Sequence, residues 1–228
     1  MSTKLVTDPS VHVRASLAEA VCKIAPVVGQ DNSIDHLVPI VTQLIKDANT
    51  EVRLSLMAHI GLVCKTIGKE PTDKHIIPSI IELCNDKQWR VRYSTIEFFP
   101  KLAEMIDHQL FKDKLESVTI QLLSDIVFSI RERSIDNLIE MRLQFGQDWF
   151  ENLFITKFTE FITNPKCHMR LTAILMARKS VGKIDKRTMN EKLIPAIIIL
   201  YTDKVPNVRF NIPKFLDEAE IIINEKNV

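Results

Sequence analysis

The sequence predicts an all-α protein built from stacked pairs of helices, and three observations carry this prediction. A short motif recurs at a constant spacing along the chain, as it does in helical repeat proteins. The segments on both sides of each motif place apolar residues three and four positions apart, which is the period of one helical face. No segment alternates apolar and polar residues as a half-buried strand does, and only 5 of the 228 residues are glycine. The fold class that fits all three observations is an α-α superhelical solenoid.

The repeated motif begins with an acidic or amide residue and ends six positions later with an arginine that follows an aliphatic residue. Neighbouring arginines are 39 residues apart at every step, since 53−14, 92−53, 131−92, 170−131 and 209−170 give the same value. Such regularity indicates one array of 39-residue units. We call the first residue and the arginine of each motif its frame. The frame residues are Asp8 and Arg14, Asp47 and Arg53, Asp86 and Arg92, Asp125 and Arg131, Asn164 and Arg170, and Asp203 and Arg209.

Each motif separates two predicted helices, and the unit at 30–68 illustrates both. Residues 33–46 precede the motif and residues 51–67 follow it. The apolar residues expected on one face of the first helix are Ile34, Leu37, Ile40, Val41, Leu44 and Ile45. Those expected on one face of the second helix are Val52, Leu56, Ile60, Val63 and Ile67.

Glycine marks the end of the second helix in three units. Gly29, Gly68 and Gly146 share one repeat position, which Asp107 and Asp185 occupy in two other units. Glycine adopts the left-handed conformation that commonly ends a helix. We therefore expect a left-handed C-cap at the three glycines.

Proline recurs inside the first helix, at Pro39, Pro78 and Pro195. Ser117 and Thr156 take the same position in the intervening units. An internal proline removes a backbone hydrogen bond and clashes with the preceding turn, at about 3 kcal/mol. We therefore expect a kink in the first helices that carry it.

The spacing divides residues 1–228 into one array. An orphan second helix at about 8–29 is followed by five helix pairs at about 30–68, 69–107, 108–146, 147–185 and 186–228. Solenoids normally end in polar capping repeats, but isoleucines lie near the C-terminal end, at 197–199 and 221–223. We expect the chain to be a fragment of a longer array.

Composition excludes several classes of protein. A net charge of +1 gives no basic footprint for nucleic acid. The apolar stretches are shorter than a membrane span, and the first residues lack the apolar core of a signal peptide. Cytoplasmic, and also nuclear, residence is therefore expected.

Side chains that carry chemistry form no recognisable site. Cys22, Cys64, Cys84 and Cys167 match no zinc-binding spacing, so free thiols are expected, with no metal and no cofactor. The chain has no glycine-rich phosphate loop and no nucleophile elbow. His36 and His75 occupy one repeat position and therefore belong to different units. We predict that the protein is not an enzyme.

The frame residues have a structural interpretation. Each Asp or Asn could cap a helix or accept hydrogen bonds from the arginine of an adjacent unit, forming a structural ladder. Exposed ion pairs of this kind contribute about 0–1 kcal/mol each. The ladder would therefore fix the register of the units more than it stabilises them.

The residues inside the frame vary, and we expect function there. Three places after the acid stand Val11, Thr50, Trp89, Phe128, Cys167 and Pro206, and next to them His12, Glu51, Arg90, Ser129, His168 and Asn207. Loops between helices are normally polar, whereas tryptophan and arginine dominate protein interfaces. Two interpretations of Trp89 and Phe128 remain open from the residues alone: contact with a partner, or packing beneath a neighbouring turn.

The unit length and the motif resemble HEAT repeats rather than the shorter tetratricopeptide or ankyrin units. More narrowly, the sequence resembles the HEAT-repeat scaffolding A (regulatory) subunits of protein phosphatase 2A, over essentially the whole chain. Residues 8–14, 89–92 and 207–211 carry this resemblance, together with 34–39 and 96–100. The sequence departs from the pattern at 128–129 and across 167–183.

The resemblance implies a C-terminal segment of such a scaffold, with a role in signal transduction. Successive turns would bind the phosphatase catalytic subunit, and the intact protein would also bind regulatory subunits. The residues expected to contact the catalytic subunit are Trp89, Arg90, Arg92, Phe128, Ser129, Cys167, His168, Pro206 and Asn207. The alternative is a HEAT-repeat transport receptor or other adaptor that grips cargo on its concave face.

Overall fold

The computed structural model describes the backbone of residues 2–224 and the side chains of residues 4–219. The described backbone is helical with short connections and contains no strand, which confirms the all-α prediction. The chain divides into two compact units, Met1–Leu122 and Leu123–Val228, each of which contains several of the 39-residue repeats. We call them the first and the second unit. Residues 225–228 of the last predicted helix pair and the isoleucine side chains at 221–223 lie outside the described residues. None of the described helices is both long and apolar enough to cross a membrane.

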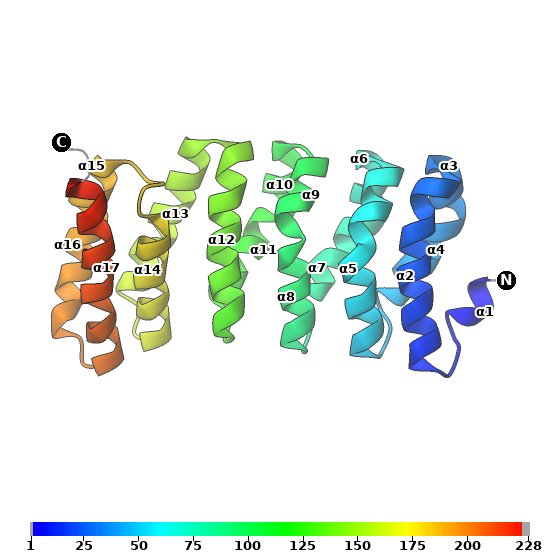
Figure 1. Ribbon diagram of the computed structural model, residues 1–228, viewed down its shortest axis with the longest axis horizontal. Helices are drawn as coiled ribbons and strands as arrows, with labels where there is room; N and C mark the ends of the chain where they lie inside the picture. Colours follow the sequence, from blue (N-terminus) through cyan, green and yellow to red (C-terminus); the bar gives the residue numbers. More distant parts are fainter. Residues whose placement is uncertain (1, 225–228) are drawn as a thin grey trace. The chain divides into compact units, whose positions relative to one another are not determined.

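The first unit contains second helices and segmented first helices in alternation (Figure 1). Its second helices are α2 (Val11–Val28), α5 (Thr50–Ile67), and α8 (Trp89–Glu97) continued by α9 (Phe99–Met105). The helices that precede them are α1 (Ser2–Leu5), α3 (Gln30–Asn32) with α4 (Val38–Leu44), and α6 (Lys69–Pro71) with α7 (Ile77–Leu83). A further first helix, α10 (His108–Lys114) with α11 (Glu116–Leu122), follows α9.

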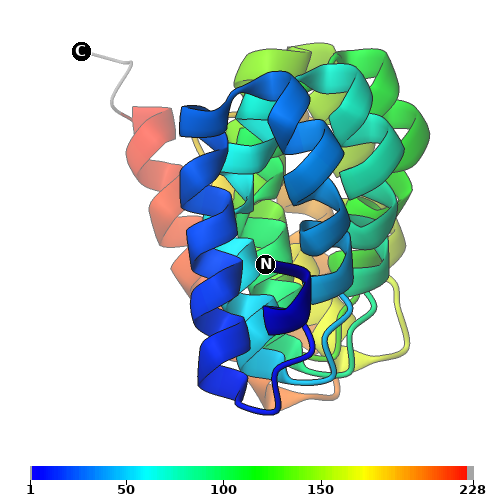
Figure 2. The same ribbon diagram turned by 90° about the vertical axis from the view of Figure 1, so that its right-hand side faces the viewer.

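Helices of the same kind pack side by side within this unit. Helix α5 contacts α2 on one side and α8 and α9 on the other, and Figure 1 shows α2, α5 and α8 in a row. Figure 2 shows α2 standing beside the helix formed by α3 and α4. All five apolar residues predicted for the inner face of α5 are buried, which confirms the pattern between Val52 and Ile67.

The second unit repeats this arrangement. Its helices are α12 (Phe128–Phe145), α13 (Gln147–Ile162), α14 (Cys167–Ser180), α15 (Lys186–Thr188), α16 (Ile194–Ile198), the 3₁₀ turn η4 (Ile199–Thr202) and α17 (Pro206–Asn224). Helix α13 packs between α12 and α14, and α14 also packs against α17. The core of α13 is aromatic, with Phe150, Phe154, Phe158 and Phe161 buried.

A π-helical turn precedes each of the three repeated prolines. The turns are η1 (Ser33–Leu37), η2 (Thr72–Ile76) and η3 (Met189–Leu193). In η1 the N–H of Val38 donates to the carbonyl of Ser33, five residues earlier, just before the proline that has no N–H to donate. At the position of the predicted kink the structure has one wider turn, and the proline is the second residue of the α-helical segment that follows.

The wider turn shifts the buried face of the first helix by one position. Ser33 and Val38, five residues apart, are both buried, whereas Ile34 and Leu37 are only half-buried. The prediction that Ile34 and Leu37 lie on the core face is therefore wrong, because it assumed an unbroken α-helical period. Beyond the turn, Ile40, Val41, Leu44 and Ile45 are buried as predicted.

The glycines that connect consecutive 39-residue repeats differ from the predicted left-handed cap. Gly29, Gly68 and Gly146 have φ of +82°, +81° and +91°, but ψ of 178°, −179° and 163°. This region is essentially restricted to glycine. One glycine is the whole connection between two helices here, so an extended ψ is needed to reverse the chain. Where Asp107 or Asp185 replaces the glycine, its carboxylate caps the following helix instead, accepting from the N–H of Leu110 or Thr188.

Candidate partner-binding surface

The frame acid shapes the turn that joins the two helices of a pair. In all six motifs its side-chain oxygen accepts a hydrogen bond from the backbone N–H two residues later, at 2.8 Å in five motifs and 3.0 Å at Asn164. Asp and Asn favour this local turn because their short side chains reach their own backbone. The second helix begins directly after the turn. The conformation of the turn is therefore set by hydrogen bonds within the chain itself.

The frame arginine closes the same turn from the other side. In every motif its Nη1 donates to the backbone carbonyl of the frame acid six residues earlier, at 2.5–2.8 Å. A carbonyl at the end of a first helix has no intrahelical partner. The arginine thus satisfies a backbone group within its own motif.

Arg14, Arg53 and Arg170 also reach the next motif. Nε of Arg14 lies 2.7 Å from Oδ2 of Asp47, and Nε of Arg53 lies 2.9 Å from Oδ2 of Asp86. In the second unit, Nη2 of Arg170 donates to Oδ1 of Asp203 at 2.9 Å. The hydrogen bond from Arg170 lowers the pKa of Asp203 below its ordinary value. These pairs connect consecutive turns at a separation of 33 residues.

Arg131 differs from the other three. The residue 33 positions later is Asn164, and Nε of Arg131 donates instead to Oγ1 of Thr172 at 2.9 Å. Arg131 is only 6% exposed. Burial lowers the pKa of its guanidinium, an effect that the charge of Asp125 partly opposes.

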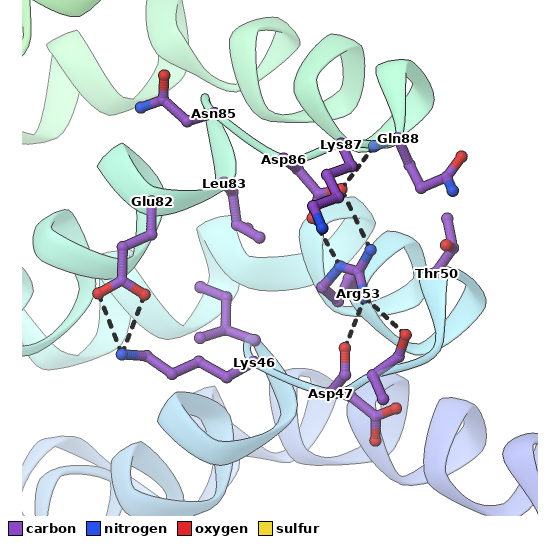
Figure 3. Close-up of a pocket in the computed structure, with 12 residues that line it drawn as sticks. Lys46, Asp47, Thr50, Arg53, Glu82, Leu83, Asn85, Asp86, Lys87 and Gln88 are labelled. Carbon is purple, nitrogen blue, oxygen red and sulfur yellow. Dashed lines mark hydrogen bonds and ion pairs between the residues drawn. The ribbon is translucent and has the colours of Figure 1, made fainter.

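A cavity of about 570 Å³ lies beside the Arg53–Asp86 pair (Figure 3). Its lining includes Lys46 and Glu82, whose charged atoms lie 3.0 Å apart, and Lys87. Three cationic and three anionic side chains line it: Lys46, Arg53, Lys87, Asp47, Glu82 and Asp86. Four of the six pair with each other. With its charges balanced, the cavity favours neither an anion nor a cation, and we assign it no ligand.

Three of the four cysteines are buried. Within the described part of the chain, no group of three His, Cys, Asp or Glu residues is arranged to hold a metal ion. Burial raises the pKa of Cys22 and of Cys64 to about 12, and that of Cys84 is also raised by burial. These three thiols stay protonated near neutral pH and act as small apolar groups. Cys167 is half-buried.

Trp89 begins helix α8 and lies open to solvent. Its side chain is 42% exposed. The guanidinium carbon of Arg90 lies 5.6 Å from the ring centroid, and the ring of Tyr93 meets the indole edge-on at 6.5 Å. Arg90 is itself exposed. The indole is therefore held by two neighbours on its own helix and still offers an aromatic and cationic surface.

The turn before α12 carries a second exposed apolar group. Phe128 is 53% exposed, and its ring lies 5.7 Å from the guanidinium carbon of Arg131. Ile126, at the tip of the same turn, is 86% exposed. The sequence analysis missed Ile126. The signal was available, because the equivalent positions hold Pro9, Ala48, Lys87, Pro165 and Lys204, none of them a large aliphatic residue.

The remaining predicted contact residues are less uniform. Pro206 and Asn207 are exposed at the start of α17, whereas Ser129, Cys167 and His168 are half-buried. Arg92 is half-buried, and its Nη1 donates to the carbonyl of Asp86 at 2.6 Å. Phe210, one helical turn after Pro206, is an exposed aromatic residue that the sequence analysis did not select. Each turn therefore offers a small surface of its own.

Solved structures with this fold are helical repeat proteins. The structure of Cex1p is 18% identical, with a TM-score of 0.69 over 100% of this chain and 44% of that chain. Importin beta is 11% identical, with a TM-score of 0.73 over 99% of this chain and 31% of that chain. The HEAT-like repeats protein from Thermococcus onnurineus NA1 is 14% identical, with a TM-score of 0.50 over 98% of this chain and 87% of that chain. These likenesses confirm the HEAT-repeat solenoid fold.

The chain spans less than half of the length of Cex1p and of importin beta. A search of curated protein sequences finds no significant match. The family comparison is more specific, because residues 31–162 match the PIK3R4-like middle domain. The matched segment is more than half of the chain and includes the turns that bear Trp89 and Phe128. The chain therefore belongs to the PIK3R4-like middle-domain family.

Proposed function

We propose that the protein is a non-enzymatic scaffold whose turns bind the catalytic subunit of a protein phosphatase 2A-type serine/threonine phosphatase. The intact protein would assemble that subunit with regulatory subunits in the cytoplasm and also in the nucleus. The observation that carries the proposal is the exposed pair of Trp89 and Arg90 at the start of α8, in a stretch that resembles the phosphatase scaffolds. Tryptophan and arginine contribute most often to the energetic centre of a protein interface.

The turns are suited to binding because they are rigid before contact. Each is fixed by a hydrogen bond to the frame acid and by another from the frame arginine. A preformed surface avoids much of the entropy loss that accompanies ordering on binding. Several small contacts at a fixed spacing can then add up to a specific interface.

The proposal is tested by titrating a purified phosphatase 2A-type catalytic subunit with the full chain in a surface-binding assay. Replacing Trp89 with alanine removes an exposed anchor. We expect the Kd to rise at least tenfold, which corresponds to a loss of about 1.4 kcal/mol of binding free energy. Leu143→Ala is the matched control, because Leu143 is 81% exposed within α12 and belongs to no turn. The control should bind as the parent does.

Two outcomes would contradict the proposal. The parent chain could fail to bind the catalytic subunit, or Trp89→Ala could bind it with unchanged affinity. Thermal unfolding of both variants separates loss of an interface from loss of the fold. A pull-down that recovers transport cargo or a small GTPase instead would favour a transport receptor.

A further inference from the structure

Arg131 does not form the ion pair that connects other consecutive turns. In the same compact unit, Arg170 pairs with Asp203 across 33 residues, and the same step from Arg131 leads to Asn164. Arg131 donates only to neutral groups: Oγ1 of Thr172 at 2.9 Å and the carbonyls of Asp125 and Ile126 at 2.8 and 3.0 Å. Its Nη2 has no acceptor among the described residues. A buried guanidinium is thus left without a paired carboxylate.

The surroundings of Arg131 strengthen its positive potential. Lys166 is exposed two residues after Asn164, and His168 lies half-buried beyond it. Burial lowers the pKa of His168, and so do the charges of Arg131 and Lys166. The charges of Arg131 and Lys166, which disfavour the protonated form of His168, would attract an anion. The motif that begins at Asn164 has an amide where the other five motifs have a carboxylate.

Apolar side chains lie directly beside this charge. The Phe128 ring is within 5.7 Å of the Arg131 guanidinium carbon, and Ile126 projects from the same turn. A ligand that reaches Nη2 of Arg131 therefore meets Phe128 and Ile126 as well. This combination selects a carboxylate that is carried next to an apolar group.

We propose that the turn at 125–131 binds an acidic side chain of a protein partner, flanked by an apolar residue, and that this carboxylate supplies the negative charge that the amide of Asn164 does not offer to Arg131. It would accept a charge-assisted hydrogen bond from Nη2 of Arg131 and lie near Lys166. One available guanidinium nitrogen suits a carboxylate oxygen better than a phosphate, which needs several donors. The inference rests on the proposed function in that the partner is a protein.

A peptide titration tests the site without the phosphatase. The probes are acetyl-Leu-Glu-Leu-amide and the same peptide with Gln in place of Glu, added to the full chain labelled with nitrogen-15. We expect the Glu peptide to shift the Arg131 Nε–H signal and the His168 ring signals at least tenfold more than the Gln peptide at equal concentration. Equal shifts from the two peptides would overturn the proposal.

Asn164→Asp supplies the missing carboxylate from within the chain, at the place where the other pairs have one. We expect this variant to lose the response to the Glu peptide. Asn49→Asp is the matched control, since it adds the same charge at a turn where Arg14 already pairs with Asp47. An undiminished response in Asn164→Asp, or an equal loss in both variants, would overturn the site.

The catalytic subunit provides a second, independent measurement. Asn164→Asp should bind it about tenfold more weakly than Asn49→Asp does. If the parent does not bind the subunit, the proposed function fails while the peptide result still decides the carboxylate site. If the subunit binds and the peptide gives no selective shift, the carboxylate site fails while the scaffold function stands.

Discussion

Arg170 and Arg131 occupy the same position in consecutive motifs and differ in what they meet. Arg170 donates to a carboxylate of Asp203, which accounts for the raised pKa of the guanidinium. Arg131 faces Asn164 across the same separation and donates to the hydroxyl of Thr172 instead, and burial lowers its pKa. Both arginines keep the bond to the carbonyl of their own frame residue, at 2.8 Å in each case.

The difference shows that the arginine has two separable roles. The bond within the motif depends only on backbone geometry, so it survives every change of side chain among the six motifs. The bond to the next motif depends on one carboxylate oxygen, so an amide in its place redirects the side chain. The first role maintains the turn, and the second connects consecutive units.

The largest expected effect comes from deleting the carboxylate that Arg170 uses. Asp203→Ala leaves a partly buried guanidinium unpaired and removes the acceptor for the N–H of Val205. We expect the free energy of unfolding to fall by about 2–3 kcal/mol, less than for a fully buried pair. Asn164→Ala removes only a turn hydrogen bond and should lose about 1 kcal/mol. Urea unfolding followed by circular dichroism measures both, and equal losses would contradict the comparison.

Asp203→Asn gives Arg170 the amide that Arg131 has at the same separation, and its effect on stability should depend on pH. The folded-state pKa of Asp203 is lowered, so its contribution is complete above the ordinary Asp pKa of about 4 and disappears as the pH falls through the lowered value. We expect a loss of about 1–2 kcal/mol at neutral pH. Unfolding curves at pH 7 and at progressively lower pH should show parent and variant converging below pH ~4. A difference that stays constant on acidification would rule out the ion pair as its source.

Thr172→Val removes the one side-chain acceptor that Arg131 has among the described residues. The buried Nε would then lose its hydrogen bond, at about 1–2 kcal/mol. Thr42→Val is the control, because the Thr42 and Thr172 hydroxyls both donate to the carbonyl four residues earlier and only Thr172 also accepts from an arginine. Thermal unfolding should show the larger shift for Thr172→Val. Similar shifts would mean that the hydroxyl contributes little to holding Arg131.

The smallest expected effect is a gain. Asn164→Asp should let Arg131 form the pair that Arg170 forms, which stabilises the chain by about 0.5–1 kcal/mol because the pair is partly exposed. Asn49→Asp adds the same charge without completing a pair and should not stabilise. Differential scanning calorimetry of the two variants measures the gain. A decrease in the stability of Asn164→Asp would show that the two arrangements are not interchangeable.

The sequence alone located the helices and the motifs because both follow strict periods. It could not show which atoms the frame residues contact. Asp47, for example, accepts a hydrogen bond from the N–H of Asn49 and also pairs with Arg14. It also could not anticipate that Thr172, two residues after the next frame arginine, would replace a carboxylate. Whether Thr172 can accept this hydrogen bond depends on how α12 and α14 lie against each other, which a linear pattern does not specify.

The errors have a common cause in local backbone geometry. Ile34 and Leu37 were placed on the core face by an α-helical period that the π-helical turn η1 interrupts. The glycine caps were assigned the usual left-handed ψ, although a connection of one residue requires an extended ψ. In both cases the composition of the segment predicts the element, and the path of its backbone does not follow from composition.

The proline-linked π-helical turns mean that equal repeats in sequence are unequal in length along the helix axis. The unit with the unbroken helix α13 and the unit with η1 both have 39 residues, yet η1 winds five residues into a turn that an α-helix completes with four. Its first helix is therefore shorter by about one residue's rise, ~1.5 Å. Pro39, Pro78 and Pro195 each follow such a turn, so these first helices are shorter than an unbroken α-helix of the same number of residues. Repeats with equal numbers of residues therefore differ in the length of their first helices.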